Sequence, residues 1–191
     1  MKLILSFIVL SFSTWLFANT NNTFIQSAQN QIGKTVSYNP AYKTIKYPMG
    51  HIPLSKGVCT DVVVRAFRGV KVDLQERIYK DKRKTPKRYK GLYYTDKLDP
   101  NIDHRRVKNI QAYLLSKGYR VNDAFKAGDI VVWKLKGRKG KSLDHIGICS
   151  DNKNRHGEPL IIHNINSGVK EEDVLRRYKI VDHFRVFEGI K

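Results

Sequence analysis

The chain has 191 residues and a formal net charge of +19, with 36 basic and 17 acidic side chains. Hydrophobic residues make up 41% of it and aromatic residues 10%, which excludes a disordered chain and suits one domain with a hydrophobic core. So large a positive charge indicates that the protein meets something anionic.

Residues 1–18 have the pattern of a secretory signal peptide. Lys2 supplies the positive start, a long apolar run follows, and Ala18 is a candidate cleavage position. The apolar run is short for a membrane span, so we expect a periplasmic or secreted protein with no stable membrane insertion after cleavage. Leu16 is larger than the side chain that cleavage favours there, which leaves an uncleaved anchor as the alternative. The domain is then residues 19–191.

Apolar residues at helical spacing predict two helices in the first half of the domain. The first covers residues 23–32 and is ended by Gly33. The second begins at Cys59 and is closed by Gly69, and its buried stripe holds Val62, Val63, Ala66, Phe67 and Val70. A weaker pattern predicts a short helix and a basic loop between residues 72 and 98.

The second half of the domain reads mainly as sheet. Asp103 is expected to cap a helix that runs to about Lys117, and a short charged helix is expected from about Glu171 to Tyr178. Apolar segments bounded by turn residues predict four strands, near residues 130–133, 145–148, 160–163 and 184–187.

Cys59 lies at the leading end of its helix, and this position has chemical consequences. The first amides of a helix are unpaired and the helix dipole favours negative charge there, so a thiol at this place loses its proton more easily. The same amides stabilise an oxyanion on a carbonyl under attack. A cysteine on an apolar stripe is otherwise a core residue, and that alternative stays open.

Two histidines follow Cys59 at strand-like segments, His145 and His163. A nucleophile, a base and an orienting group are the three parts that a thiol hydrolase needs. Strand alternation places His145, Gly147 and Cys149 on one face, and the glycine lets another backbone approach. We expect no metal site, since His145 and Cys149 are too far apart along a strand to share one ion, and no cofactor.

The chain has two cysteines, Cys59 and Cys149, and export would favour a disulfide between them. Cys149 lies four strand residues beyond His145, which is roughly 13 Å. A disulfide requires Cα atoms within about 7 Å of each other. If His145 lies beside Cys59, the disulfide and the catalytic pair therefore largely exclude each other.

These motifs resemble the NlpC-type papain-like cysteine peptidases: a cysteine at a helix start, Gly-Asp before a hydrophobic strand, His-x-Gly-Ile, and a polar residue on the next strand. More narrowly, nearly the whole chain after the signal resembles the exported bacterial YijF-like family. The segments that carry this resemblance are Gly57–Asp61, Asn101–Val107, Gly128–Val131, His145–Ile148 and Ile162–Asn164.

The resemblance implies an α+β papain-like fold, with the nucleophile helix packed on an antiparallel sheet. It also implies Cys59 as nucleophile, His145 as base and His163 as the orienting third residue. Three further residues are candidates for contact with substrate or oxyanion: Tyr38, Asp61 and Asn164. The common Asp-Cys-Ser-Gly motif is Val-Cys-Thr-Asp here, so Asp61 either receives a substrate amine or favours the first turn of the helix.

The predicted function is an exported cysteine amidase or endopeptidase that cleaves an amide bond, with peptidoglycan stem peptides as the suggested substrate. Two basic clusters, at residues 80–90 and 134–141, are either solvated faces or contacts for peptidoglycan or another anionic cell-envelope polymer. No nucleic acid partner is expected for an exported protein. The alternatives are a non-catalytic polyanion-binding module, and a thiol acyltransferase or toxin amidase that acts on a non-wall substrate.

Overall fold

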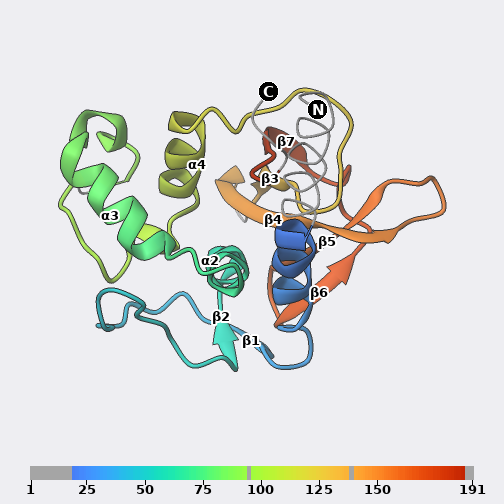
Figure 1. The fold of residues 1–191 in the computed structure, drawn as a ribbon, viewed down its shortest axis with the longest axis horizontal. Coiled ribbons are helices and arrows are strands. Elements are labelled where there is room, and N and C mark those ends of the chain that lie inside the picture. The colour runs from blue at the N-terminus through green and yellow to red at the C-terminus, as the bar shows by residue number, and fades with distance from the viewer. Residues whose placement is uncertain (1–18, 94–95, 138–139, 188–191) are drawn as a thin grey trace, which may run out of the picture.

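The computed structural model describes residues 19–93, 96–137 and 140–187, so the predicted signal peptide lies outside the described residues. The fold is α+β: helices pack against an antiparallel sheet (Figure 1). Within the described ranges, no helix is both long enough and apolar enough to cross a membrane.

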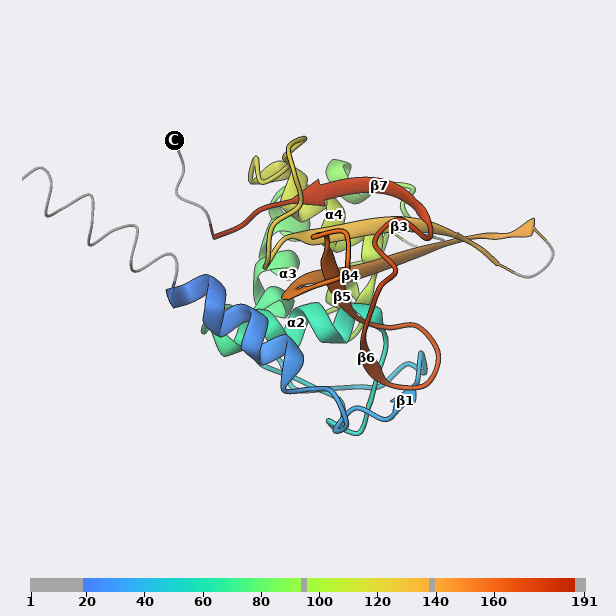
Figure 2. The same ribbon diagram turned by 90° about the vertical axis from the view of Figure 1, so that its right-hand side faces the viewer.

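Five strands form the main sheet, in the order β6-β5-β4-β3-β7 with every neighbouring pair antiparallel. Figure 2 shows β7, β3 and β4 above helix α2, with β6 at a lower level. Their bounds are β3 (Ile130–Lys136), β4 (Ser142–Lys153), β5 (Pro159–Asn164), β6 (Val169–Glu172) and β7 (Lys179–Phe184). A separate two-stranded parallel sheet joins β1 (Ser37–Tyr38) and β2 (Lys56–Gly57).

The helices lie on one side of the sheet. A first helix includes residues 19–29, and α2 runs beneath the sheet while α3 and α4 lie beyond it (Figure 1). The bounds are α2 (Cys59–Gly69), α3 (Leu74–Lys84) and α4 (Val107–Ser116), with two short 3₁₀ turns, η1 (Pro86–Tyr89) and η2 (Asp103–Arg105).

The strands are apolar on both faces, and each face therefore has its own cluster of buried side chains. The face against α2 contributes Ile130, Val132, Ile146, Ile148 and Ile162 to the larger cluster. The opposite face holds Val131, Trp133, Cys149 and Ile161, together with Val174 and Leu175. The valine-rich face of α2 completes the larger cluster. This packing holds the helix against the sheet and so fixes the position of its first residue, Cys59.

Most of the predicted elements are present. The first helix buries Phe24, Ile25 and Ala28, although Ile32 lies beyond its helical residues and is 40% exposed. The cysteine helix has the predicted bounds, and the strands that carry the two histidines are in place. The predicted α+β architecture, with helices packed against an antiparallel sheet, is thus confirmed.

Three local predictions were wrong. The last strand, predicted near residues 184–187, is β7 (Lys179–Phe184) and ends where the prediction began. Asp103 is not a helix cap: its carboxylate is buried and accepts hydrogen bonds from Nζ of Lys82 at 2.9 and 3.0 Å, because a buried ammonium needs a charged partner. The residues around Glu171 are not helical either. They form β6, because the edge of β5 offers backbone partners that a short charged helix would lack.

Candidate active site

Cys59 occupies the first position of α2 and lines an open cleft of about 240 Å³. Its side chain is nearly buried, with 4% of the residue exposed, so the thiol lies at the base of the cleft. The walls include Tyr38, Tyr93, Arg106 and Asp144. The cysteine is free and so is Cys149, which packs in the cluster on the other face of the sheet. The two cysteines therefore form no disulfide.

The segment around Cys59 is held by Asp61 and Asn164. Nδ2 of Asn164 donates to the carbonyl of Gly57 at 3.1 Å, which ties the end of β5 to the approach to α2. Oδ2 of Asp61 accepts from the amide of Val58 at 2.7 Å and closes the first turn. Both oxygens of Asp61 also accept from the buried guanidinium of Arg105, at 3.0 and 3.1 Å. These contacts support the helix-terminus role of Asp61, which the sequence left open.

His145 and His163 lie on neighbouring strands, on the face of the sheet opposite to α2. Nε2 of His145 is 2.8 Å from Nδ1 of His163, as expected for a second histidine that orients the first. Nε2 of His163 is 2.9 Å from Oε2 of Glu172 on β6. His145 also packs against the ring of Trp133, its partner across β3 and β4, at 5.9 Å between centroids. The imidazole of His145 is thereby fixed on two sides.

The sulfur of Cys59 reaches the backbone of β4 beside His145. It accepts a hydrogen bond from the backbone amide of Ile146, the residue that follows this histidine. Nε2 of His145 faces His163, and its ring lies with Trp133 on the sheet face away from α2. Among the described residues, the thiol and this imidazole make no direct hydrogen bond with each other.

Burial decides the protonation of this pair. It raises the pKa of Cys59 to about 12, although backbone amides of Ile146, Thr60 and Cys59 itself lower that pKa. Burial and the neighbouring His163 lower the pKa of His145 to about 3. The resting site therefore holds a neutral thiol and a neutral imidazole. The predicted gain in acidity at the helix terminus is present, but desolvation outweighs it.

Tyr38 stands on the wall of the same cleft, at the end of β1. It is 37% exposed, and its strand pairs with the residues just before Cys59. Burial, and next the proximity of Cys59, raises the pKa of its phenol to about 12. The hydroxyl therefore keeps its proton at neutral pH and can donate to an anionic oxygen formed in the cleft, in line with the oxyanion contact expected for it.

The cleft walls carry opposite charges. The guanidinium of Arg106 lies 4.7 Å from the ring centroid of Tyr93, and the carboxylate of Asp144 is part of the same lining. Arg105 also lines the cleft, but its donors are used by Asp61 and by the carbonyls of Asn39 and Ala41. Arg106 has a looser partner, since its Nη1 lies 3.5 Å from Oδ1 of Asp103 and 17% of its side chain is exposed.

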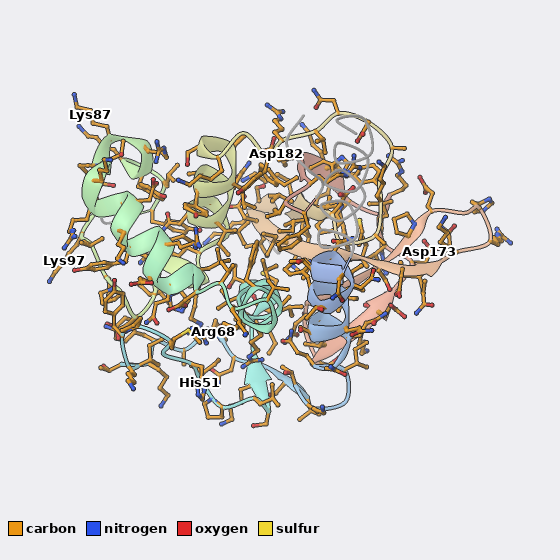
Figure 3. All side chains as sticks on the ribbon, viewed as in Figure 1. His51, Arg68, Lys87, Lys97, Asp173 and Asp182 are labelled. Carbon is orange, nitrogen blue, oxygen red and sulfur yellow. The ribbon has the colours of Figure 1, made fainter. Side chains whose placement is uncertain are left out.

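Several cations of the two basic clusters have acidic partners. Lys82 is buried against Asp103, and three exposed or half-buried pairs are Lys80–Glu76, Arg88–Asp81 and Lys134–Asp144. Lys87 and Lys97 lie at the outer edge of the α3 side (Figure 3). In the part of the chain that the structure describes, no three His, Cys, Asp or Glu side chains are grouped to hold a metal ion.

A family model described as "Domain of unknown function (DUF1287)" matches residues 25–186. The chain belongs to the DUF1287 family. It is 43% identical over 175 residues to "Uncharacterized protein YijF" of Escherichia coli (strain K12), an alignment that covers 89% of this chain and 83% of that protein. No solved structure matches the chain. The match includes the whole cleft, both histidines and Glu172.

Glu172 is the residue of this DUF1287 site that the sequence did not reveal. Because a helix was predicted from about Glu171 to Tyr178, Glu172 was not expected on a strand, and no contact between it and His163 was predicted. The alternation that brings it near is visible only once β6 is recognised as a strand, paired with β5 through His163 and Lys170.

Gly147 makes the close approach of His163 possible. A methyl group here would lie 2.8 Å from Cγ2 of Ile161 and 3.2 Å from Cβ of His163. We expect Gly147→Ala to cost about 1–3 kcal/mol of unfolding free energy by overpacking and to displace the second histidine. Urea unfolding and a crystal structure of the variant would measure both effects. An unchanged stability with His163 in place would contradict the expectation.

Acid is expected to destabilise this DUF1287 protein. Burial lowers the pKa of His104 to about 4 and that of His145 to about 3. An unfolded histidine has a pKa near 6.5, so the unfolded chain binds more protons and stability is lost as pH falls below that value. Together the two histidines are expected to lower the free energy of unfolding by about 2–3 kcal/mol as the pH falls from 6 to 5. Urea titrations at pH 7, 6 and 5 would test this, and a flat profile would refute it.

Proposed function

We propose that this chain is an exported, NlpC-type papain-like cysteine hydrolase that cleaves an amide bond in peptidoglycan stem peptides. The observation that carries the proposal is the position of Cys59, at a helix N-terminus in an open cleft, with its sulfur hydrogen-bonded to the backbone amide of Ile146 on β4, the residue after the predicted base. That base is His145, whose Nε2 is held by His163. The signal-like residues 1–18 support export.

The reaction begins with a proton transfer inside a neutral pair. Nδ1 of His145 takes the thiol proton as the sulfur of Cys59 bonds to the scissile carbonyl carbon. The resulting oxyanion accepts from the backbone amide of Cys59, and Tyr38, which lines the same cleft and keeps its phenol proton, donates a second hydrogen bond. Generating the thiolate only as it attacks suits the site, because a buried charge without a partner is costly.

The second half of the reaction restores the enzyme. The imidazolium of His145 gives its proton to the leaving amine as the C–N bond breaks, which leaves a thioester on Cys59. A water molecule then loses a proton to His145 and attacks the thioester carbonyl. Breakage of the C–S bond returns the proton to the sulfur and releases a carboxylic acid, so the net reaction adds one water across the amide.

The charged residues that line the cleft suit a peptide that carries both a carboxylate and an amine. Arg106 and Asp144 both line the cleft, so a substrate that carries a carboxylate and an amine would meet both signs there, in competition with the pairs Arg106–Asp103 and Lys134–Asp144. Stem peptides of peptidoglycan contain both groups close to each amide bond. The many paired cations, among them Lys82 and Arg88, give less support to a module that binds polyanions by charge alone.

Mass spectrometry of digested peptidoglycan tests the proposal. Purified sacculi are incubated with the wild type and with Cys59→Ala, and soluble products are compared. We expect wild-type products heavier by one water per cleaved amide, whose masses name the bond, and none with the variant. No products from the wild type, or equal products from both proteins, would reject the assignment.

A further inference from the structure

Three side chains from three adjacent strands form one line of hydrogen bonds. His145 on β4 contacts His163 on β5 at 2.8 Å, and His163 contacts Glu172 on β6 at 2.9 Å. The line runs from the buried base to a carboxylate at the edge of the sheet, whose side chain is 39% exposed. Both imidazoles are almost fully buried, so water does not offer them alternative partners.

The carboxylate dictates which nitrogen of each ring carries a proton. A glutamate carboxylate at neutral pH only accepts hydrogen bonds, so Nε2 of His163 must be the protonated nitrogen. A neutral imidazole has one N–H, which leaves Nδ1 of His163 as an acceptor. The proton between the rings therefore belongs to Nε2 of His145. Nδ1 of His145 is then the bare nitrogen, the one that can accept a proton.

Without the carboxylate the opposite arrangement becomes available. His163 could carry its proton on Nδ1 and donate to Nε2 of His145, which would then be protonated on Nδ1. A base in that state cannot take the proton of Cys59. The hydrogen bond between the two rings is equally good in both arrangements, so it cannot select one by itself.

We propose that Glu172 is a positioning residue that fixes the tautomers of both histidines and so makes His145 a base toward Cys59. The catalytic meaning of this inference rests on the proposed function, but the tautomers themselves do not. The pKa of both histidines is lowered chiefly by burial, which keeps the rings neutral, as the assignment requires. Glu172 acts in the opposite direction on His163, and Lys170 opposes Glu172.

The neighbouring Glu171 provides a matched control. It lies on the same strand, but its carboxylate accepts from the hydroxyl of Ser150 and from Nδ2 of Asn152, with no histidine in contact. Glu171→Gln removes the same charge from the same edge strand. Any effect found for Glu172→Gln and absent from Glu171→Gln therefore comes from the contact with His163.

Nuclear magnetic resonance of protein labelled with ¹⁵N-histidine tests the tautomers directly. Protonated and bare ring nitrogens differ widely in ¹⁵N shift, and single His→Gln variants assign the signals. We expect Nε2–H for both His145 and His163 in the wild type and in Glu171→Gln, and a mixture or reversal in Glu172→Gln. Nδ1–H on either ring of the wild type, or unchanged tautomers in Glu172→Gln, would overturn the proposal.

Kinetics provide the second readout. We expect Glu172→Gln to lower kcat by about tenfold to hundredfold with little change in KM, and Glu171→Gln to match the wild type. Equal kcat values for all three proteins would overturn the positioning role. If the wild type hydrolyses no peptidoglycan while the tautomers are as assigned, the proposed function fails and the tautomer assignment stands. Thermal unfolding confirms that both variants fold.

Discussion

Cys59→Ala, His145→Ala and the double variant are expected to lose hydrolysis to the same extent, on the order of 10⁴-fold or more. In the proposed mechanism the two side chains act as one unit, because the thiol is protonated at rest and attacks only when Nδ1 of His145 removes its proton. Burial raises the pKa of Cys59 to about 12, so very little thiolate exists at neutral pH without the base. Removing the second partner after the first therefore costs almost nothing more.

Steady-state rates with a stem-peptide substrate would measure these losses. Cys149→Ala is the matched control: the second cysteine is also buried, but it packs against Trp133 and Ile161 on the other face of the sheet. We expect that variant to retain wild-type activity. Losses that multiply in the double variant, or residual activity in His145→Ala near that of the wild type, would show that thiol and imidazole work separately.

Asp61→Ala is expected to lower the free energy of unfolding by about 3–5 kcal/mol. The substitution leaves the guanidinium of Arg105, with 2% of its side chain exposed, buried without its charged partner. It also removes the acceptor for the amide of Val58 at the start of α2. The penalty comes mainly from the stranded charge, because a buried ion pair contributes little net stability while intact.

Urea unfolding at pH 7 would measure the effect of Asp61→Ala. Glu76→Ala serves as control, since it breaks the exposed i,i+4 pair with Lys80, whose side chain is 60% exposed. That loss should stay within about 0.5 kcal/mol. A loss of similar size in both variants would mean that Arg105 finds new partners or water once its carboxylate is gone.

Local patterns in the sequence were sufficient for the parts of the site that lie on regular elements. The apolar spacing after Cys59 placed the thiol at a helix start, and strand alternation put Gly147 opposite an approaching backbone. The contact between His145 and His163 followed from their positions on neighbouring strands. Each of these predictions depends on contacts within one element or between two strands joined by a short turn.

The remaining features depend on contacts that no local pattern encodes. In the sequence Lys82 is one cation of a basic run. In the structure it is buried and its Nζ donates to Asp103, a residue 21 positions further along the chain. Glu172 reads as helical because charged residues suit a helix surface, and only the free edge of β5 makes it a strand residue. The raised pKa of the Cys59 thiol was not predicted either, because the desolvation that raises it depends on how the whole core packs around the helix terminus.

Strand β6 has a second consequence that follows from its place at the border of the sheet. No strand follows β6 in the described sheet, although the amide of Val169 donates to the carbonyl of Thr35, and such a border can recruit a strand from another molecule. The strand is only four residues long, and three of the four are charged, Lys170, Glu171 and Glu172. Short length and charge both discourage intermolecular pairing, so the carboxylate that holds His163 also helps to keep one copy of the protein apart from the next.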